Sequence, residues 1–185
     1  YQQFLLWYQQ AGTPEVTIKA NYDNATKRYT LACSQTCPPT PGQKIKQPFH
    51  MPITIGFLCQ KTGEQLHEEV LSFTQESQAF VFENINAAPI PSLFRNFSAP
   101  VKLNFQRADN DFLHILRYDT DAFNRWDALQ TLASKLILNL ADSYIVGKLL
   151  SLDKQFSLVF AELLENSQSD LRFVAECLNL PSESY

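Results

Sequence analysis

Proline and glycine are distributed unevenly along this chain, and that unevenness constrains the fold more than any single motif. Nine of the ten prolines and four of the five glycines lie before residue 107. Both residue types break helix interiors and mark the turns between short strands. We therefore expect an all-β part that ends near residue 106, followed by an all-α part over residues 107–185.

Short alternating segments in the first part predict a β-sandwich. Period-two alternation of apolar and polar residues indicates a strand with one buried face. The buried positions would be Val16/Ile18, Tyr29/Leu31/Cys33, Ile53/Ile55/Phe57, Leu71/Phe73, Phe80/Phe82 and Val101/Leu103/Phe105. A further strand around Leu93–Asn96 would bring the count to about seven, the number of an Ig-like sandwich. Lys61–Glu64 is predicted to be a hairpin turn, and the proline-rich stretch Thr36–Pro48 a loop.

Spacings of three and four in the second part predict four helices. The first would run from a cap at Asp109 to Tyr118, and the second would be long and capped by Asp121 or Thr120. A third is expected over Leu150–Glu165, and a fourth would start at a capping box, Ser167–Asp170, and end near Leu178. The long helix carries one apolar face, made of Phe123, Trp126, Leu129, Leu132, Leu136 and Leu140.

Charge and hydropathy exclude some classes of protein. The net charge is −4 and the pI is near 5.3, which argues against a nucleic-acid binder that depends on electrostatics. No apolar run reaches the roughly 18 residues of a transmembrane helix, so no membrane partner is expected. The charged fraction of 18% is below the roughly 25% of an average domain, which suggests that part of the surface is covered by another domain.

Few residues suggest a catalytic or ligand-binding role. Cys33, Cys37, His50 and Cys59 could in principle bind zinc, but their spacing matches no standard zinc motif, and buried free cysteine is the more common role. Asp111 and His114 could touch on a helix as a surface pair. Trp7 and Tyr8 are expected to pack on a neighbouring domain. We therefore predict no catalytic, cofactor-binding or metal-binding residue, and no disulfide between Cys33 and Cys37.

Several ordered motifs resemble the aminopeptidase N family of bacterial type, which are zinc metallopeptidases. The stretch FLLWYQQAGTPEV begins at Phe4, KQPFHMPITIGF at Lys46 and FVFENI at Phe80. PIPSLFRNFSAPVKL begins at Pro89 and RYDTDAFNRWDALQTL at Arg117, and these last two carry the most weight. The resemblance runs from Phe4 to Pro181, which is nearly the whole chain.

The resemblance implies a three-part organisation. Residues 1–12 would end a helix of the preceding catalytic domain, 13–106 would form the Ig-like sandwich, and 107–185 would be the first helices of a superhelical C-terminal domain. The chain lacks the family's H-E-x-x-H zinc motif, its G-x-M-E-N motif and its catalytic tyrosine, so no catalytic or zinc residue is carried over. Zinc and peptide substrates would belong to the parent enzyme, which we expect in the cytoplasm.

Two hypotheses for function follow. In the first, the chain is an interdomain module of an aminopeptidase whose partner is the catalytic domain of the same polypeptide. The absence of an initiator methionine and the abrupt ends favour this hypothesis. In the second, it is a stand-alone Ig-like binding or adaptor module. In either case we expect self-association through helical faces at Leu136/Ile137/Leu140, Phe156/Val159/Phe160/Leu163 and Phe173/Val174/Leu178, with a second apolar patch at Phe4, Leu5 and Trp7.

Overall fold

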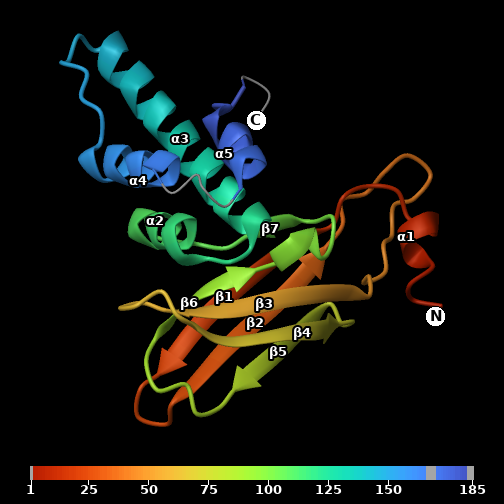
Figure 1. The fold of residues 1–185 in the computed structure, drawn as a ribbon. Coiled ribbons are helices and arrows are strands. Elements are labelled where there is room, and N and C mark those ends of the chain that lie inside the picture. Colours follow the sequence, from red (N-terminus) through yellow and green to blue (C-terminus); the bar gives the residue numbers. More distant parts are fainter. Residues whose placement is uncertain (1, 166–169, 183–185) are drawn as a thin grey trace. The chain divides into compact units, whose positions relative to one another are not determined.

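The computed structural model describes residues 2–165 and 170–182. The chain divides into two compact units, residues 1–106 and 107–185, and each has a hydrophobic core of its own. Strands occupy the first unit and, apart from the short α1 (Leu6–Gln9), the α-helices occupy the second (Figure 1). The expected fold class, all-β followed by all-α, is confirmed.

Seven strands in the described part of the first unit form two sheets. The four-stranded sheet has the order β5-β2-β1-β7 and the three-stranded sheet the order β4-β3-β6. The bounds are β1 Glu15–Asp23, β2 Arg28–Thr36, β3 Met51–Cys59, β4 Gln65–Phe73, β5 Ser77–Phe82, β6 Pro89–Leu93 and β7 Lys102–Asn104. All pairings are antiparallel except that of β1 with β7.

Most of the alternating residues identified in the sequence form the core between the two sheets, but Leu103, predicted to be buried, is 37% exposed on the short β7. Val16, Leu31, Ile53, Ile55 and Phe57 are completely buried. The predicted hairpin turn lies between β3 and β4, where Gly63 has a φ of +76° that favours glycine. Strand β2 extends to Thr36, so Cys33 lies within the strand and not at its end.

The prediction of a strand around Leu93–Asn96 is wrong. The strand is β6, Pro89–Leu93, and a short 3₁₀ helix, η1 (Arg95–Phe97), follows it. Phe94, Asn96 and Phe97 all have φ values between +50° and +55°, which an extended chain does not adopt. The strand signal therefore stops where the backbone turns into the left-handed region.

Four helices occupy the described part of the second unit. They are α2 (Asp109–Tyr118), α3 (Ala122–Ile145), α4 (Lys154–Glu165) and α5 (Leu171–Leu178). Leu116, Leu129, Val159, Leu163 and Cys177 form their shared core. Among the described residues, no helix is both long and apolar enough to cross a membrane.

Three of the four helix starts differ from the predictions. Asp109 is the first residue of α2 and not its cap; its carboxylate instead lies 2.6 Å from Lys135 Nζ. Helix α4 begins at Lys154, four residues later than predicted, because Asp153 accepts a hydrogen bond from the Phe156 N–H and so caps it. Asp121 caps α3 as expected. Ser167–Ser169 of the predicted capping box lie outside the described residues, and Asp170, which that box would place inside the helix, is itself the cap of α5.

Candidate functional site

The four residues weighed as zinc ligands have separate roles in the first unit. Cys33 belongs to the sandwich core, and the Cys37 thiol lies 3.7 Å from the Ala11 carbonyl oxygen. His50 Nε2 is 3.0 Å from Ser72 Oγ, and Cys59 ends β3. Among the described residues, no group of three or more histidine, cysteine or acidic side chains could hold a metal. The residues present therefore do not fit a zinc site.

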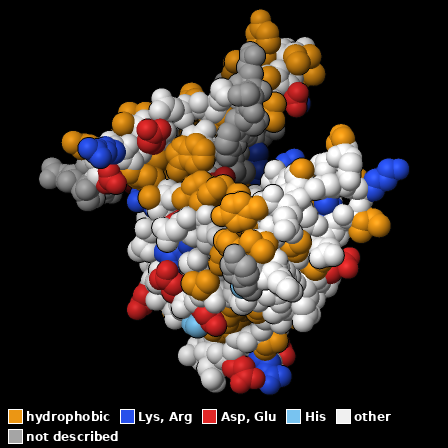
Figure 2. All heavy atoms as spheres, turned by 90° about the vertical axis from the view of Figure 1, so that its right-hand side faces the viewer, with side chains coloured by type: hydrophobic (Ala, Val, Ile, Leu, Met, Phe, Trp, Pro, Cys, Tyr) orange, Lys and Arg blue, Asp and Glu red, His pale blue; other side chains and the backbone are white. Residues whose placement is uncertain are grey.

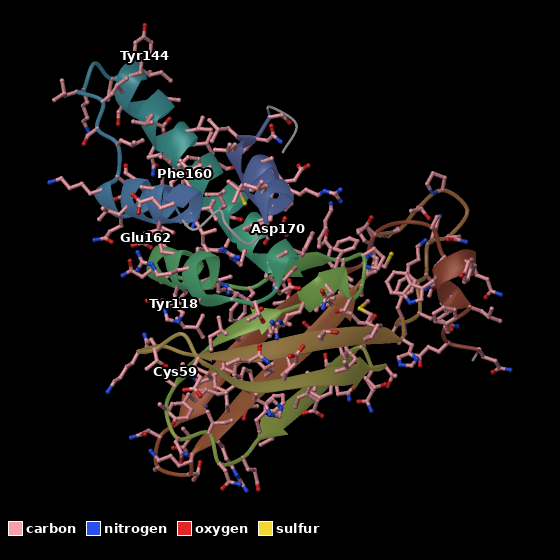
Figure 3. The ribbon with its side chains drawn as sticks, in the orientation of Figure 1. Cys59, Tyr118, Tyr144, Phe160, Glu162 and Asp170 are labelled. Carbon is pink, nitrogen blue, oxygen red and sulfur yellow. The ribbon has the colours of Figure 1, made fainter. Side chains whose placement is uncertain are left out.

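The thiols differ in how easily they ionise, and all four cysteines are free. Burial raises the pKa of Cys33 to about 11. Burial also raises the pKa of Cys177 to about 11, although Arg125 acts in the opposite direction. The Thr62 side chain, with the backbone N–H groups of Thr62 and Lys61, lowers the pKa of Cys59. Figure 3 shows Cys59 at the edge of the sandwich.

We therefore expect alkylation by iodoacetamide to be faster at Cys59 than at Cys33 and Cys177. The thiolate is the reacting species, and near pH 8 its fraction should be larger at Cys59 than at these two buried cysteines. Peptide mass spectrometry at successive times would rank the four sites. Faster labelling of Cys33 than of Cys59 in the folded chain would contradict the expectation, and the denatured chain, in which the rates should converge, is the control.

The other two histidines contact aromatic rings, whereas His50 pairs with the Ser72 hydroxyl as described above. The His67 ring packs 5.6 Å from the Phe57 ring, and its Nε2 lies 3.2 Å from Glu69. The His114 ring lies 4.7 Å from that of Tyr118.

Trp7 and Tyr8, the aromatic pair near the N-terminus, lie in different environments. The Trp7 Nε1–H donates to the His50 carbonyl oxygen at 2.9 Å, and its ring lies 4.5 Å from that of Phe49. Trp7 therefore packs on the sandwich of its own unit, which corrects the prediction that both aromatic residues pack on a neighbouring domain. Tyr8 is 79% exposed.

The motif that starts at Pro89 places a buried arginine across β3. Arg95 is 3% exposed, and its Nη1 donates to Gln65 Oε1 at 2.9 Å and lies 3.2 Å from Glu68 Oε2. The guanidinium crosses Gly56, where a Cβ atom would come within 2.8 Å of Arg95 Nη1. The left-handed residues around Arg95 and the missing side chain at Gly56 together make room for this charge.

Replacing Gly56 by alanine should lower the free energy of unfolding by about 1–3 kcal/mol, the usual cost of overpacking a buried site. The added methyl group would displace a guanidinium that is fixed by two partners. Urea titration of Gly56→Ala measures the loss, and the same change in an Arg95→Ala background is the control. An equal loss in both backgrounds would show that Arg95 is not the cause.

The motif that starts at Arg117 organises the helical unit. The Asp121 side chain accepts from the Asn124 N–H at 2.8 Å and so begins α3. Arg125 Nε donates to the Leu116 carbonyl oxygen at 2.9 Å, and its guanidinium lies 4.5 Å from the centre of the Phe173 ring. This arginine thus joins α2, α3 and α5. Burial lowers the pKa of Arg125, but an arginine stays charged in either case.

A pocket of about 280 Å³ lies among the four helices. Arg117 binds Glu162 at its rim through two hydrogen bonds of 2.6 and 2.9 Å. Asp170 lines another side and accepts from the Arg172 and Phe173 N–H groups (Figure 3). Opposite charges are therefore matched within the pocket. The described residues that line it include no serine, cysteine or histidine that could act as a nucleophile or base.

Exposed apolar side chains gather where α3 ends, and we call these residues the α3 patch. Figure 2 shows hydrophobic side chains at the top of the molecule, and Figure 3 places Tyr144 at this tip. The α3 patch consists of Ile137, Leu138, Tyr144, Ile145, Val146, Leu149, Leu150 and Leu152. By contrast, Val159, Leu163 and Val174 are buried within the helical unit, which corrects their prediction as uncovered positions.

Sequence reasoning did not find the pairing of Arg117 with Glu162, the stacking of Arg125 on Phe173 or the burial of Arg95. These contacts join residues that lie 27 to 48 positions apart in the chain, and no local periodicity indicates such a contact. All three arginines lie in the two motifs that carry most of the family resemblance. Their place in these motifs was the only indication in the sequence that they have a structural role.

Comparison with known proteins gives consistent matches along the whole chain. A family model described as a domain of unknown function (DUF3458) with an Ig-like fold matches residues 12–106. A second, DUF3458_C, described as ARM repeats, matches residues 109–185.

Two curated relatives and one solved structure illustrate the extent of the similarity. Aminopeptidase N of Escherichia coli K12 is 40% identical, over 97% of this chain and 21% of its own length. Aminopeptidase N of Haemophilus influenzae is 33% identical, over 98% and 22%. The crystal structure of Legionella pneumophila aminopeptidase A in complex with aspartic acid has a TM-score of 0.80 and 32% identity, over 98% of this chain and 20% of that one. The chain thus spans about a fifth of the length of these relatives.

Proposed function

Because the chain belongs to the DUF3458 family and fits a fragment of aminopeptidase N, we propose that it is a non-catalytic interdomain part of such an enzyme. The parent would be a zinc metallopeptidase that removes N-terminal residues from peptides. In it, the Ig-like unit would follow the catalytic domain, and this region would position the C-terminal helices over that domain.

One observation carries the proposal: nearly all of this chain aligns with only about a fifth of each relative. The described side chains add support, because the residues of both family motifs hold local structure. Arg95 fills the space above Gly56, and Asp121 and Arg125 order the helices. Zinc and peptide substrates are accordingly proposed for the parent alone, with the catalytic domain of the same polypeptide as the partner of this region.

We further propose the cytoplasm as the compartment, with neither nucleic acid nor a membrane as partner. Four free cysteines support a reducing environment. The pI near 5.3 does not favour phosphate-backbone binding.

A chimera tests the interdomain role. The matching segment of E. coli aminopeptidase N would be replaced by these 185 residues, and kcat/KM would be measured on an aminoacyl substrate. We expect activity within about tenfold of the parent, a change of roughly 1.4 kcal/mol in the barrier, because a scaffold transfers without its catalytic groups. Activity as low as that of a parent lacking the segment, from a chimera shown to be folded by circular dichroism, would contradict the proposal.

The isolated chain should hydrolyse no aminoacyl substrate and retain no stoichiometric zinc after dialysis. The reason is that the described residues offer no group of zinc ligands and the sequence contains no H-E-x-x-H. Metal analysis that finds about one zinc per chain would contradict this prediction. It would then point to the second hypothesis, a module with a site of its own.

A further inference from the structure

Strand β1 has an open edge over two thirds of its length. Along one side it pairs with β2 from Glu15 to Asp23. Along the other side it pairs with β7 at Glu15–Thr17 alone, because β7 ends at Asn104. Within the described part of the chain, residues Ile18–Asp23, which we call the β1 edge, therefore have no strand beside them on that side. An unpaired edge is a template for a further strand.

The orientation of the backbone along this edge follows from one hydrogen bond. The Lys102 N–H donates to the Pro14 carbonyl oxygen at 2.9 Å, so Pro14 presents its backbone groups toward β7. Alternate residues of a strand present their N–H and C=O groups to the same side. Ile18, Ala20 and Tyr22 therefore direct theirs to this side. The ladder with β7 ends at the pair Thr17–Asn104, so the backbone groups of Ala20 and Tyr22 lie beyond it.

A groove lies beside this edge. It has a volume of about 900 Å³ and is lined by Thr17, Ile18, Lys19, Ala20, Leu103, Asn104, Phe105 and Gln106. Val16 and Ile18 are buried on the inner face, but the next residue on that face, Ala20, is exposed. Because β7 stops beside Thr17 and Ala20 is small, there is room next to Ala20 for an apolar side chain of an added strand.

The other sheet edges are less suited to such pairing. Strand β6 contains Pro89 and Pro91, which have no N–H to donate. Strand β4 carries the neighbouring carboxylates Glu68 and Glu69. The Gln78 side chain of β5 accepts from the Thr74 N–H and donates to the Ser72 carbonyl oxygen, which ties the start of β5 to the end of β4.

Charged side chains on the outer face of the β1 edge would favour one direction and one charge pattern in an added strand. Lys19 and Asp23 are exposed, and the described residues show no ion pair for Lys19. The hydrogen bond from Thr26 Oγ1 and those from the Ala25 and Thr26 N–H groups lower the pKa of Asp23, so it stays charged at neutral pH. Arg28, its neighbour on β2, is paired with Glu83 at 2.8 Å.

We propose that the β1 edge binds an extended peptide from another molecule as an additional antiparallel strand. The peptide would place an acidic residue opposite Lys19, a basic residue opposite Asp23 and an apolar residue beside Ala20. Strand addition of this kind draws affinity from main-chain hydrogen bonds and specificity from alternate side chains. This binding site is additional to the proposed interdomain role and does not depend on it.

A peptide fits this edge better than a second copy of the chain does. Two β1 edges could pair antiparallel, but the turn at residues 24–27 of one copy would then approach the end of β7 in the other. A lone peptide has no such turn and can extend beside Ile18 into the groove. The occupant is therefore taken to be a peptide, and pairing between copies is an outcome that the test can detect.

The probe is the acetylated and amidated peptide Lys-Val-Thr-Val-Glu-Val, whose lysine would lie opposite Asp23 and whose glutamate would lie opposite Lys19. Added to the ¹⁵N-labelled chain, it should shift the amide signals of Ile18, Ala20 and Tyr22 in a saturable manner. The matched control exchanges the lysine and the glutamate. Two reversed cross-strand charge pairs should weaken binding about five- to thirtyfold.

Two variants test the register. Lys19→Glu should reduce or reverse the preference between the two peptides. Ala20→Pro removes one outward N–H without removing a donor to β2, and should weaken binding of the first peptide at least about tenfold, whereas Ala20→Ser, which keeps the N–H and a small side chain, should retain it. If Ala20→Pro does not fold, as judged by its amide spectrum, Lys19→Glu decides.

Three results would overturn the proposal. The first is equal affinity for the two peptides in the wild type, and the second is an unchanged preference in Lys19→Glu. The third is a set of shifts centred on β4 or β5, or concentration-dependent changes at Ile18–Asp23 without peptide, which would indicate pairing between copies.

Discussion

The isolated chain should self-associate at micromolar concentration through the α3 patch. Leu149 is 94% exposed and Ile145 is 78% exposed. Tyr144, Val146, Leu150 and Leu152 are also exposed, at the end of α3 and in the segment that follows it. Contiguous exposed apolar surface above a few hundred Å² tends to acquire partners. In an ARM-like array, each repeat covers the apolar face of its neighbour, and a second copy can provide similar cover.

The size of the effect follows from the area involved. Burying 400 Å² of apolar surface corresponds to about 10 kcal/mol at roughly 25 cal/mol per Å². Association itself costs an estimated 4–15 kcal/mol, so we expect a weak to moderate dimer and not a permanent one. This surface includes Ile137, one of the positions first predicted, but not Phe160 or Phe173, which pack against the helical core. A charge at either of these positions would disturb the fold instead of the contact.

Sedimentation velocity at several concentrations measures the self-association. The wild type should show a species larger than the monomer, and Ile145→Glu should shift it toward the monomer. Val70→Glu on β4 is the matched control, because Val70 is also an exposed apolar residue, 61% accessible, but lies in the other unit. A monomeric wild type, or an equal effect of both substitutions, would show that the α3 patch is not the contact.

The strands were predictable because their pattern is local. Period-two alternation identified the buried residues of β1, β2, β3, β4 and β5. The turn between β3 and β4 was predictable because Gly63 lies in it. The strand predicted around Leu93–Asn96 is β6, which ends at Leu93. It was misplaced because Leu93, Phe94 and Phe97 resemble a continued apolar stretch. The positive φ values of Phe94 and Asn96 depend on how Arg95 is accommodated over Gly56, and that depends on packing between distant strands.

The helix starts also show that local signals are predictable and contacts between distant residues are not. Asp121 caps α3 through the nearby Asn124 N–H, as the sequence indicated. Asp170 caps α5 through the Arg172 and Phe173 N–H groups, although the predicted capping box would place it inside the helix. Asp109 looks like a cap as well, but its carboxylate pairs with Lys135, 26 residues away. The contribution of Trp7 to the sandwich core was likewise hidden, because its partners His50 and Phe49 lie more than 40 residues further along the chain.

Replacing Phe57 by alanine should cause the largest loss of stability of any substitution considered, about 3–5 kcal/mol. Phe57 on β3 is completely buried and lies 4.9 Å, edge to face, from both Tyr29 on β2 and Phe82 on β5. It therefore joins the two sheets, and its removal leaves a cavity and breaks two aromatic pairs, each worth about 0.5–1.5 kcal/mol beyond the buried area. Since small domains are stable by only about 5–15 kcal/mol, much of the sandwich's stability would be lost.

The two tryptophans make this loss measurable in the sandwich alone. Trp7 contacts the sandwich core and Trp126 the helical core, so in a Trp126→Phe background the fluorescence reports the first unit. Urea titration in that background should show the midpoint for Phe57→Ala falling sharply with little change in slope. Val81→Ala, on an exposed side chain of β5, is the control and should change stability by less than about 0.5 kcal/mol. A loss below about 1.5 kcal/mol for Phe57→Ala would mean that the sheets close over the site, and that Phe57 is not the residue that holds them together.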